Sequence, residues 1–374
     1  MKRIEILLFC FFLVMPHMRL LAQPTVDGNW ISTPFFKDNF DYPNRQFDQN
    51  FYDPKDKWLA YGVCLSSGVT KSSTNQIYQY DRCIFDDAAG VIKLNASWIQ
   101  DTPIQCGTYA IPPDKNCDYN HHSLFYKSGM IETPPWRRFL YGYFEIRCKF
   151  PYHPGSFPAF WLWGADDSEQ YYEEIDIAEY AYNDSIGEGS PNIFSTGFLY
   201  NKHSSSTPPA GFRHLIDLPS NNDITQWHTY GCERLPGRII WYLDGEVVND
   251  YCDVDSIPCH PLTIKVNYAI DYAALTNGIP AWKGTGTMAV DYVKVYKLKC
   301  DCSTDVTITN NTQLANFDQK VKHDITIGSS NGITVLTNTN VTMRACNSIT
   351  ITGPFEVPTG AQIGMMVHPC TEND

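Results

Sequence analysis

The chain has 374 residues, of which 43% are hydrophobic and 14% aromatic, enough for one large domain and a smaller one. Its formal net charge of −13 argues against nucleic acid and against an anionic membrane surface as partners. Tyrosine, tryptophan, asparagine and glycine are abundant, while stretches typical of long helices are scarce, which predicts a mostly β protein.

Residues 1–23 have the pattern of a secretory signal peptide. Lys2 and Arg3 precede an apolar run over residues 4–15, and Ala22 supplies a small residue for cleavage. The apolar run is too short to span a membrane, and no later segment approaches a spanning length. We therefore expect a secreted protein without a membrane span, either extracellular or associated with the cell surface.

The chain contains 13 cysteines, and the loss of Cys10 with the signal peptide would leave an even number. In an oxidising compartment this predicts a set of disulfide bonds, although spacing alone does not determine the connectivity. The cysteines and histidines show no zinc spacing, so we expect no structural metal cluster. The candidate disulfide pairs are Cys106–Cys117, Cys252–Cys259, Cys346–Cys370 and Cys64–Cys83.

Residues 24–299 consist of short alternating runs separated by glycine, proline, asparagine and aspartate. The dipeptide Asp244-Gly245 between two such runs predicts a tight hairpin turn. Many short strands punctuated by turns predict a sandwich or a barrel. Three of the runs cover residues 143–150, 238–243 and 290–296.

Three carboxylates, those of Glu174, Asp176 and Glu179, fall within a short segment that otherwise has strand character. In a regular strand Glu174 and Asp176 project from one face and Glu179 from the other. One extra residue bulged out near Ile177 or Ala178 returns Glu179 to the first face. Two glutamates leaning inward would then separate their carboxyls by about 5–5.5 Å, as in a retaining glycosidase. Taken alone, the pattern also suits a solvated acidic face or a calcium-binding cluster.

The segments on either side of the acids decide between these interpretations. The upstream blocks cover residues 125–131, 141–151 and 157–164, and the downstream blocks cover residues 227–233, 240–245 and 288–296. In this order and spacing, the blocks resemble family 16 of the glycoside hydrolases, the group of laminarinases, lichenases, agarases and carrageenases. The resemblance covers about residues 35–297.

The resemblance implies an all-β fold, a concanavalin-like β-jelly-roll sandwich with the acids on its concave face. It matches Glu174 to the nucleophile, Glu179 to the acid/base and Asp176 to the helper between them. It implies a retaining endo-β-glycosidase that hydrolyses β-linked polysaccharide by double displacement and requires no cofactor. Because carboxylates this close cannot all ionise freely, we expect one shared proton and a raised pKa for Glu179.

Sugar-binding subsites need aromatic faces for stacking. Trp161 lies on the strand before the acids and matches the cleft tryptophan of the family, and Trp163 shares its face. Packing in the core is the alternative interpretation for each aromatic candidate. The further candidates for substrate binding are Trp136, Tyr180, Tyr182 and Trp282.

Asp291 is the candidate metal ligand. Relatives in the family often hold one calcium ion on the convex face through residues near the first and last strands, and Asp291 matches one such position. A structural calcium ion is therefore one interpretation of this residue. A solvated or hydrogen-bonded carboxylate is the other, because the roughly six to eight oxygens that calcium requires cannot be counted from sequence.

The sequence departs from many β-1,3-glucanases immediately before Glu174. Those enzymes place Trp-Pro and a small residue there, whereas residues 168–173 read Ser-Glu-Gln-Tyr-Tyr-Glu. The expected polysaccharide is therefore a β-1,3-glucan, a mixed-linkage glucan or a marine galactan. Two alternatives stay open, a transglycosylase on the same site and a non-catalytic glycan-binding protein, although the intact acids argue against the second. We expect a monomer.

The composition changes at Cys300, after which aromatic residues nearly vanish and Thr, Asn, Ile and Val dominate. The segment 340–361 resembles the small C-terminal stack modules of secreted bacterial proteins. Exposed stacking aromatics are missing, which favours a spacer or a secretion-related cap over a carbohydrate-binding module. Strand-like runs recur at spacings of roughly eight residues, as in a stacked β module, and include 324–327, 333–336 and 348–352.

These patterns divide the chain into three parts. We expect a signal peptide over residues 1–23, a catalytic jelly roll over residues 24–299 and a small β module over residues 300–374.

Overall fold

The computed structural model of the chain describes most of the predicted sandwich and C-terminal module. The predicted signal peptide (1–23), the pair Cys106–Cys117 and the boundary at residues 299 and 300 lie outside the described residues. No helix in the part that is described is long and apolar enough to span a membrane. The described ranges are 33–42, 44–47, 52–53, 55, 57–60, 76–100, 125–165, 171–182, 189–202, 210–235, 237–252, 257–258, 260–271, 274–276, 279–297, 303–317 and 321–367.

The larger sheet is mostly antiparallel and has ten strands within the described ranges. They are β1 (Phe36–Asp38), β3 (Gln76–Tyr78), β4 (Cys83–Asp86), β5 (Val91–Trp98), β6 (Tyr126–Ser128), β8 (Gly142–Lys149), β13 (His228–Leu235), β14 (Arg238–Leu243), β15 (Glu246–Cys252) and β19 (Thr285–Tyr296). Their order is β15-β14-β13-β8-β19-β5-β6-β3, with β1 paired to β19 and β4 to β5.

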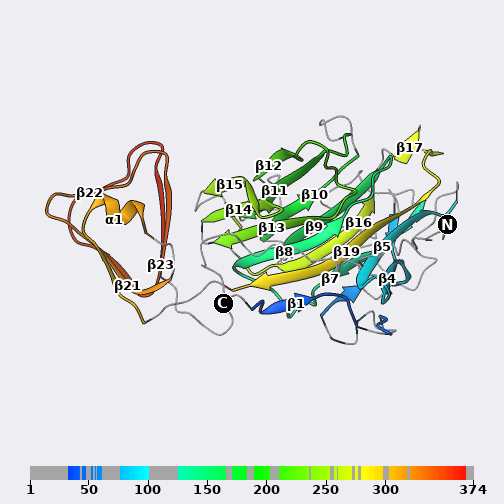
Figure 1. Cartoon of the computed structure of the whole chain (residues 1–374), viewed down its shortest axis with the longest axis horizontal. Helices are drawn as coiled ribbons and strands as arrows, with labels where there is room; N and C mark the ends of the chain where they lie inside the picture. Colours follow the sequence, from blue (N-terminus) through cyan, green and yellow to red (C-terminus); the bar gives the residue numbers. More distant parts are fainter. Residues whose placement is uncertain are drawn as a thin grey trace, which may run out of the picture.

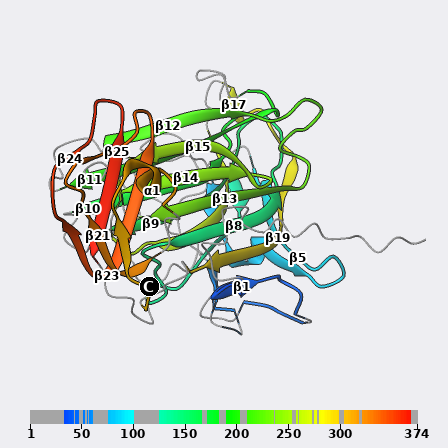
Figure 2. The same cartoon turned by 60° about the vertical axis from the view of Figure 1, so that its left-hand side comes forward.

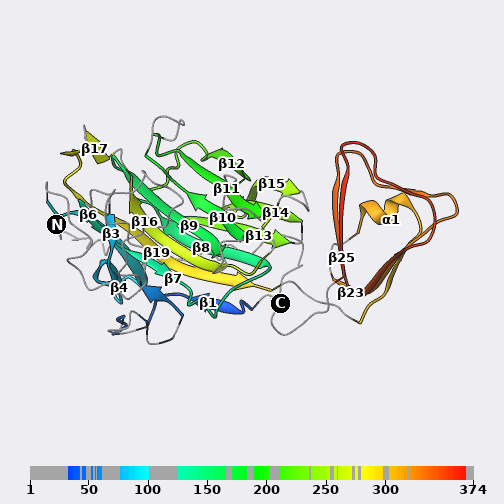
Figure 3. The same cartoon turned by 180° about the vertical axis from the view of Figure 1, so that it is seen from behind.

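The smaller sheet has seven described strands and faces the larger one (Figures 1 and 3). They are β2 (Leu59–Ala60), β7 (Met130–Glu132), β9 (Ser156–Ala165), β10 (Tyr171–Glu179), β11 (Ile193–Lys202), β12 (Ala210–Asp217) and β16 (Thr263–Ile270). Their order is β12-β11-β10-β9-β16-β7-β2, which places β10 and β9 near the middle. The two facing sheets confirm the predicted all-β jelly-roll sandwich.

One hydrophobic core fills the space between the sheets. Alternate residues of each strand point into it, because successive side chains of a strand face opposite sides. Ile175 and Ile177 of β10 enter this core from the smaller sheet, and Phe144 and Ile146 of β8 enter it from the larger sheet. The residues between them therefore lie on the outside of each sheet, where the smaller sheet presents the acids.

The predicted hairpin between β14 and β15 is confirmed. Asp244 and Gly245 form the two-residue connection with φ values of 51° and 90°, the left-handed pair that a type I′ turn requires. The Asp244 carboxylate also accepts hydrogen bonds from His228 Nδ1 at 2.7 Å and from the Thr229 backbone N–H at 2.8 Å. This contact ties the turn back to the start of β13.

The C-terminal segment forms a parallel sheet with its own core. Figure 2 shows β21, β23 and β25 lying beside one another. Its core includes Ile308, Leu314 and Ile325, and it shares no residue with the core of the sandwich. The elements are β20 (Val306–Ile308), α1 (Asn311–Ala315), β21 (Lys322–Ile327), β22 (Ile333–Thr334), β23 (Asn340–Ile351), β24 (Phe355–Glu356) and β25 (Gln362–Val367).

The cysteines depart from the expected set of disulfide bonds. Cys83, Cys148 and Cys232 are free thiols buried in the main core, where cysteine packs as a small apolar side chain. The predicted pair Cys64–Cys83 is therefore wrong, and the Cys83 thiol instead donates to the Met130 carbonyl at 3.5 Å. Cys346 is disulfide-bonded. The pairings of the other cysteines stay predictions.

Candidate active site

Strand β10 carries a bulge at the position that the acid spacing predicted. Against β9, Asp176 pairs with Trp161 and Ala178 with Phe160, so two residues of β10 advance against one of β9. Against β11 the register also slips by one residue between Asp176 and Glu179. A single extra residue at Ile177–Ala178 accounts for both shifts.

The bulge brings the three acids onto the same face of the smaller sheet. Ile175 and Ile177 are at most 1% exposed and belong to the core. Glu174, Asp176 and Glu179 are half-buried, on the face of the sheet that points away from this core. We call this the outer face. The sequence prediction that one bulge aligns the three carboxylates is therefore confirmed as geometry.

Glu174 and Asp176 form a coupled pair. Burial raises the pKa of Glu174 to about 7, the Tyr172 hydroxyl opposes this by donating a hydrogen bond to its carboxylate, and the neighbouring Glu179 adds to the rise. Burial, followed by the charge of Glu174, raises the pKa of Asp176 well above its ordinary value. The hydrogen bond between the two carboxyls favours a proton on Asp176 and a charge on Glu174. The shared proton thus belongs to this pair.

Glu179 is bound by an arginine that the sequence patterns did not indicate. Arg213 of β12 donates from Nη2 to Glu179 Oε1 at 3.2 Å and to the Ser195 hydroxyl at 3.1 Å. Ser195 in turn donates to the Glu179 backbone carbonyl at 3.3 Å. Arg213 carries no local sequence signal, because only the pairing of β10, β11 and β12 brings it beside the acids.

Two tryptophans lie next to the acids on the outer face. Trp163 pairs with Glu174 and Trp161 with Asp176 across the β9–β10 ladder, and both rings are half-buried. Lys265 of β16 places its Nζ 4.2 Å from the Trp163 ring centroid and 5.3 Å from that of Trp161. The rings thus flank the acids together with a cation that sequence reasoning missed. A role for Trp161 and Trp163 in sugar binding stays a prediction.

The Trp161 and Lys265 side chains are both held in place. The indole N–H of Trp161 donates to Asn267 Oδ1 at 2.6 Å. Lys265 Nζ forms an ion pair with Glu132 Oε2 at 3.0 Å. These contacts come from β7 and β16, so the smaller sheet itself orients the groups around the acids.

The other aromatic candidates lie in different surroundings. Tyr180 is fully buried in the core, because Glu179 faces outward and the next residue must face inward, so its predicted place in the cleft is wrong. Trp282 stacks on His153 at a ring distance of 3.7 Å and packs against the core. Tyr182 also packs against the core. Trp136 is 66% exposed on the loop after β7, where it stacks on Tyr52.

The carboxylate of Asp291, the candidate calcium ligand, is paired with an arginine. Asp291 Oδ2 lies 2.7 Å from Arg147 Nη1, and on the first strand Asp38 accepts two hydrogen bonds from Arg45, at 2.9 and 2.7 Å. Arg45 also forms an ion pair with Asp53 at 3.0 Å. Because a guanidinium group already neutralises each of these carboxylates, the pairing favours the hydrogen-bonded alternative for Asp291, and a structural calcium ion stays a prediction.

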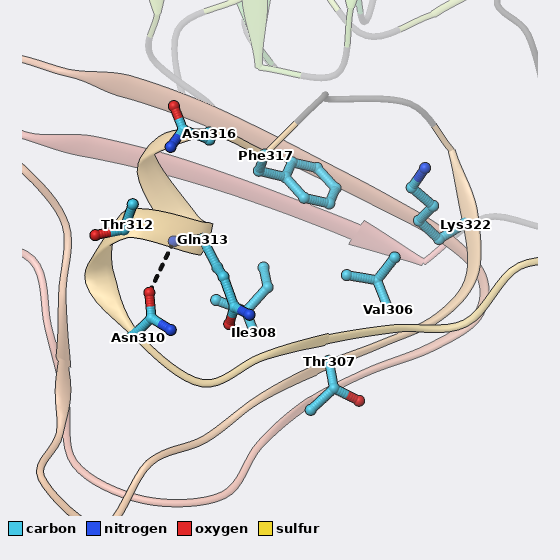
Figure 4. Close-up of a pocket in the computed structure, with 9 residues that line it drawn as sticks. All are labelled: Val306, Thr307, Ile308, Asn310, Thr312, Gln313, Asn316, Phe317 and Lys322. Carbon is cyan, nitrogen blue, oxygen red and sulfur yellow. Dashed lines mark hydrogen bonds between the residues drawn. The ribbon is translucent and has the colours of Figure 1, made fainter.

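The C-terminal module has an open pocket of about 810 Å³. Figure 4 shows Phe317, Ile308 and Val306 lining it together with the amides of α1. No carboxylate belongs to its described lining, so this pocket offers no acid/base pair. The described lining of this pocket thus has no counterpart to the acids on β10.

Comparison with known proteins agrees with this site. The family model described as glycosyl hydrolases family 16 matches residues 74–294, more than half of the chain. The chain belongs to this family. The match includes β10 and both neighbouring strands of the smaller sheet.

Two similar proteins illustrate the range of the family. An endo-1,3-1,4-beta-glycanase, ExsH of Rhizobium meliloti, is 33% identical over 177 residues, which are 47% of this chain and 34% of that protein. The kappa-carrageenase of Pseudoalteromonas carrageenovora is 28% identical over 144 residues, 35% of this chain and 34% of the carrageenase. This chain thus spans about a third of the length of these two relatives.

A solved structure shows the same fold. It comes from work on endo-acting O-glycanases that members of the human gut microbiota express to initiate mucin breakdown. The structural match has a TM-score of 0.54 and 20% sequence identity, and it covers 74% of this chain and 94% of the other. At this identity the likeness supports the fold and carries no argument about the substrate.

Proposed function

We propose that the protein is a secreted retaining endo-β-glycosidase that hydrolyses β-linked polysaccharide by double displacement. The single observation that carries the proposal is the bulge of β10, which aligns Glu174, Asp176 and Glu179 on the outer face. A lectin gains nothing from three mutually repelling carboxylates, whereas a retaining glycosidase needs two of them side by side. Membership in the family supports the same reading.

Each acid has a role in the proposed reaction. Glu174 attacks the anomeric carbon, and Glu179 donates a proton to the leaving glycosidic oxygen. Glu179 then accepts a proton from water, which hydrolyses the glycosyl-enzyme. Asp176 holds the shared proton and donates a hydrogen bond that keeps Glu174 charged and oriented. The half-buried Trp161 and Trp163 would provide stacking faces for the sugar beside Glu174.

Charge favours a neutral substrate over a sulfated one. Each described cation at the site is already paired with a carboxylate, Arg213 with Glu179 and Lys265 with Glu132. The coupled pair of Glu174 and Asp176 adds a further negative charge, and the whole chain carries a formal net charge of −13. A sulfated galactan would approach this surface against repulsion, so we favour β-1,3-glucan or mixed-linkage glucan. The name of the rhizobial relative points to the same linkages.

The test combines a substrate panel with two variants. The wild-type protein should release reducing ends from β-1,3-glucan or mixed-linkage glucan faster than from agarose or carrageenan, and the first anomer seen by NMR should retain the β configuration. Glu179→Gln should lower kcat on the glucan about 10²–10⁴-fold, and Glu174→Gln at least as much, because it removes the nucleophile.

Matched controls separate chemistry from folding. Glu246→Gln on exposed β15 should leave kcat unchanged, and circular dichroism should show that both active-site variants are folded. Near-full activity in Glu174→Gln would show that Glu174 is not the nucleophile. Product analysis with added acceptor sugar distinguishes hydrolysis from the alternative transglycosylation, since a transglycosylase would lengthen the acceptor.

A further inference from the structure

Arg213 reaches Glu179 across a gap in the outer face. In the ladder of three strands, Asp176 of β10 pairs with Gly197 of β11, and Gly197 pairs with Arg213 of β12. Glycine places no side chain between the arginine and the acids. A Cβ built at Gly197 would lie 2.3 Å from the Phe212 carbonyl oxygen, so the close approach of β12 requires glycine there. The pairing of the three strands and the glycine at position 197 therefore leave room for the Arg213 side chain to reach the acids.

The side-chain hydrogen bonds of Arg213 reach one of the three acids, Glu179, while its charge also acts to lower the pKa of Asp176. Its Nη2 bridges Glu179 Oε1 and the Ser195 hydroxyl, and Ser195 also holds the Glu179 backbone. The Arg213 side chain is 41% exposed, whereas that of Glu179 is 18% exposed. A guanidinium in this position restrains the carboxyl group and remains accessible from the outer face of the sheet.

On the basis of the proposed function, we infer that Arg213 is a positioning residue for the acid/base Glu179. It holds the carboxyl in place for proton donation to the leaving oxygen, and its charge stabilises the carboxylate form that accepts a proton from water in the second step. Arg213 acts through Glu179, so its effect depends on how much the reaction needs an acid.

The other charged groups around Glu179 include acids, which disfavour its carboxylate form, and a lysine, which interacts with Glu174. Glu174 and Asp176 on β10 share one proton, and the remaining negative charge of this pair repels that of Glu179, whereas β11 contributes only the neutral Ser195 at this register position. Beyond β9, Lys265 of β16 interacts with Glu174. Arg213 is a described cation in direct contact with Glu179, and its removal takes away this counter-charge while the repulsion from the charged Glu174–Asp176 pair remains.

The experiment compares Arg213→Gln and Arg213→Lys in the full chain. Arg213→Gln should lower kcat/KM on the glucan about ten- to hundredfold, the range expected for one charge-assisted hydrogen bond. The alkaline limb of the pH profile should move to higher pH, because the carboxylate form of Glu179 loses its cation. Arg213→Lys should recover part of the rate.

A comparison of two substrates shows whether Arg213→Gln lowers the rate through the acid/base Glu179. An aryl β-oligoglucoside with a dinitrophenolate leaving group needs little protonation, so its glycosylation step should lose much less activity in Arg213→Gln than the glucan does. Arg238→Gln is the matched control. Arg238 forms a similar ion pair with Asp250, at 2.7 Å, between β14 and β15 of the other sheet, and its loss should change neither rate nor pH profile.

Two outcomes overturn the inference. Equal losses on glucan and aryl glycoside with an unchanged pH profile would assign Arg213 a structural role only. Wild-type kinetics in Arg213→Gln would show that the contact does not matter. Glu179→Gln distinguishes these from failure of the proposed function itself: if that variant remains active, Glu179 is not the acid/base, whatever Arg213 does.

Discussion

At the scale of single residues, the position of one proton decides which carboxyl can attack. Asp176 donates a hydrogen bond to Glu174 and thereby favours the charged nucleophile, while burial raises the pKa of Glu174 to about 7. A nucleophile must be ionised, so activity should fall as the pH drops through the pKa of Glu174. The Tyr172 hydroxyl lowers the pKa of Glu174, because it donates a hydrogen bond to the same carboxylate, and it thereby favours the ionised nucleophile.

Tyr172→Phe should therefore shift the acid limb of kcat/KM to higher pH. The variant removes a hydrogen bond that lowers the pKa of Glu174, and one bond to a charged group corresponds to about one pH unit. The pH dependence of kcat/KM on the preferred glucan measures the shift. Tyr152→Phe is the control, since its hydroxyl donates to the Gly189 carbonyl outside the site. An acid limb that stays in place in Tyr172→Phe would contradict a role for this bond.

At the scale of the element, the bulge of β10 is supported from the opposite sheet. The indole N–H of Trp241 on β14 donates to the Asp176 backbone carbonyl at 2.9 Å, at the residue where the register begins to slip. A bulge interrupts the ladder and leaves backbone groups in need of other partners. Trp241 is fully buried in the core between the sheets, so it contacts the backbone of β10 from the face opposite the acids.

Trp241→Phe should loosen the bulge and the acids on it. Leaving the Asp176 carbonyl without this donor should lower the free energy of unfolding by about 1–3 kcal/mol, and kcat should fall because Glu179 depends on the bulge for its orientation. Thermal unfolding and steady-state kinetics check the two effects. Trp227→Phe on the partly exposed surface is the control. If Trp241→Phe matches wild type in both measurements, the indole does not support the bulge.

At the scale of the whole molecule, the sandwich and the C-terminal sheet have separate cores. The two clusters of buried residues share no member, and no described strand belongs to the sheets of both. Arg344 of β23 lies 5.8 Å from the ring centroid of Tyr141, just before β8, so the two parts also touch. We propose that residues 300–374 form a module that folds independently of the catalytic sandwich.

A chain that ends at residue 299 should therefore remain folded and active. Since the described part of the module contributes no carboxylate to the outer face of β10, kcat/KM on a soluble glucan oligosaccharide should stay within about twofold of the full chain. Activity assays and thermal unfolding of the shortened chain make the comparison. An unfolded protein, or a loss beyond tenfold, would mean that the module is part of the same cooperative unit.

Local patterns in the sequence predicted the parts of the site that neighbours along the chain control. The spacing of Glu174, Asp176 and Glu179 predicted the bulge, because the alternation of a strand allows only one way to align the three acids. Asp244-Gly245 predicted its turn because few dipeptides tolerate two left-handed residues in succession. Both features depend on backbone preferences within a few residues.

The sequence by itself thus determined the fold class, the bulged strand and the three acids. Only the tertiary structure brought Arg213 to Glu179 and Lys265 between the tryptophans, because these cations come from other strands and have no local pattern. It also placed Tyr180 in the core and left Cys83 unpaired. The physical reason is the same throughout. Periodicity along one strand decides on which face of the sheet a side chain lies, whereas the pairing of distant strands decides which other side chains it contacts on that face.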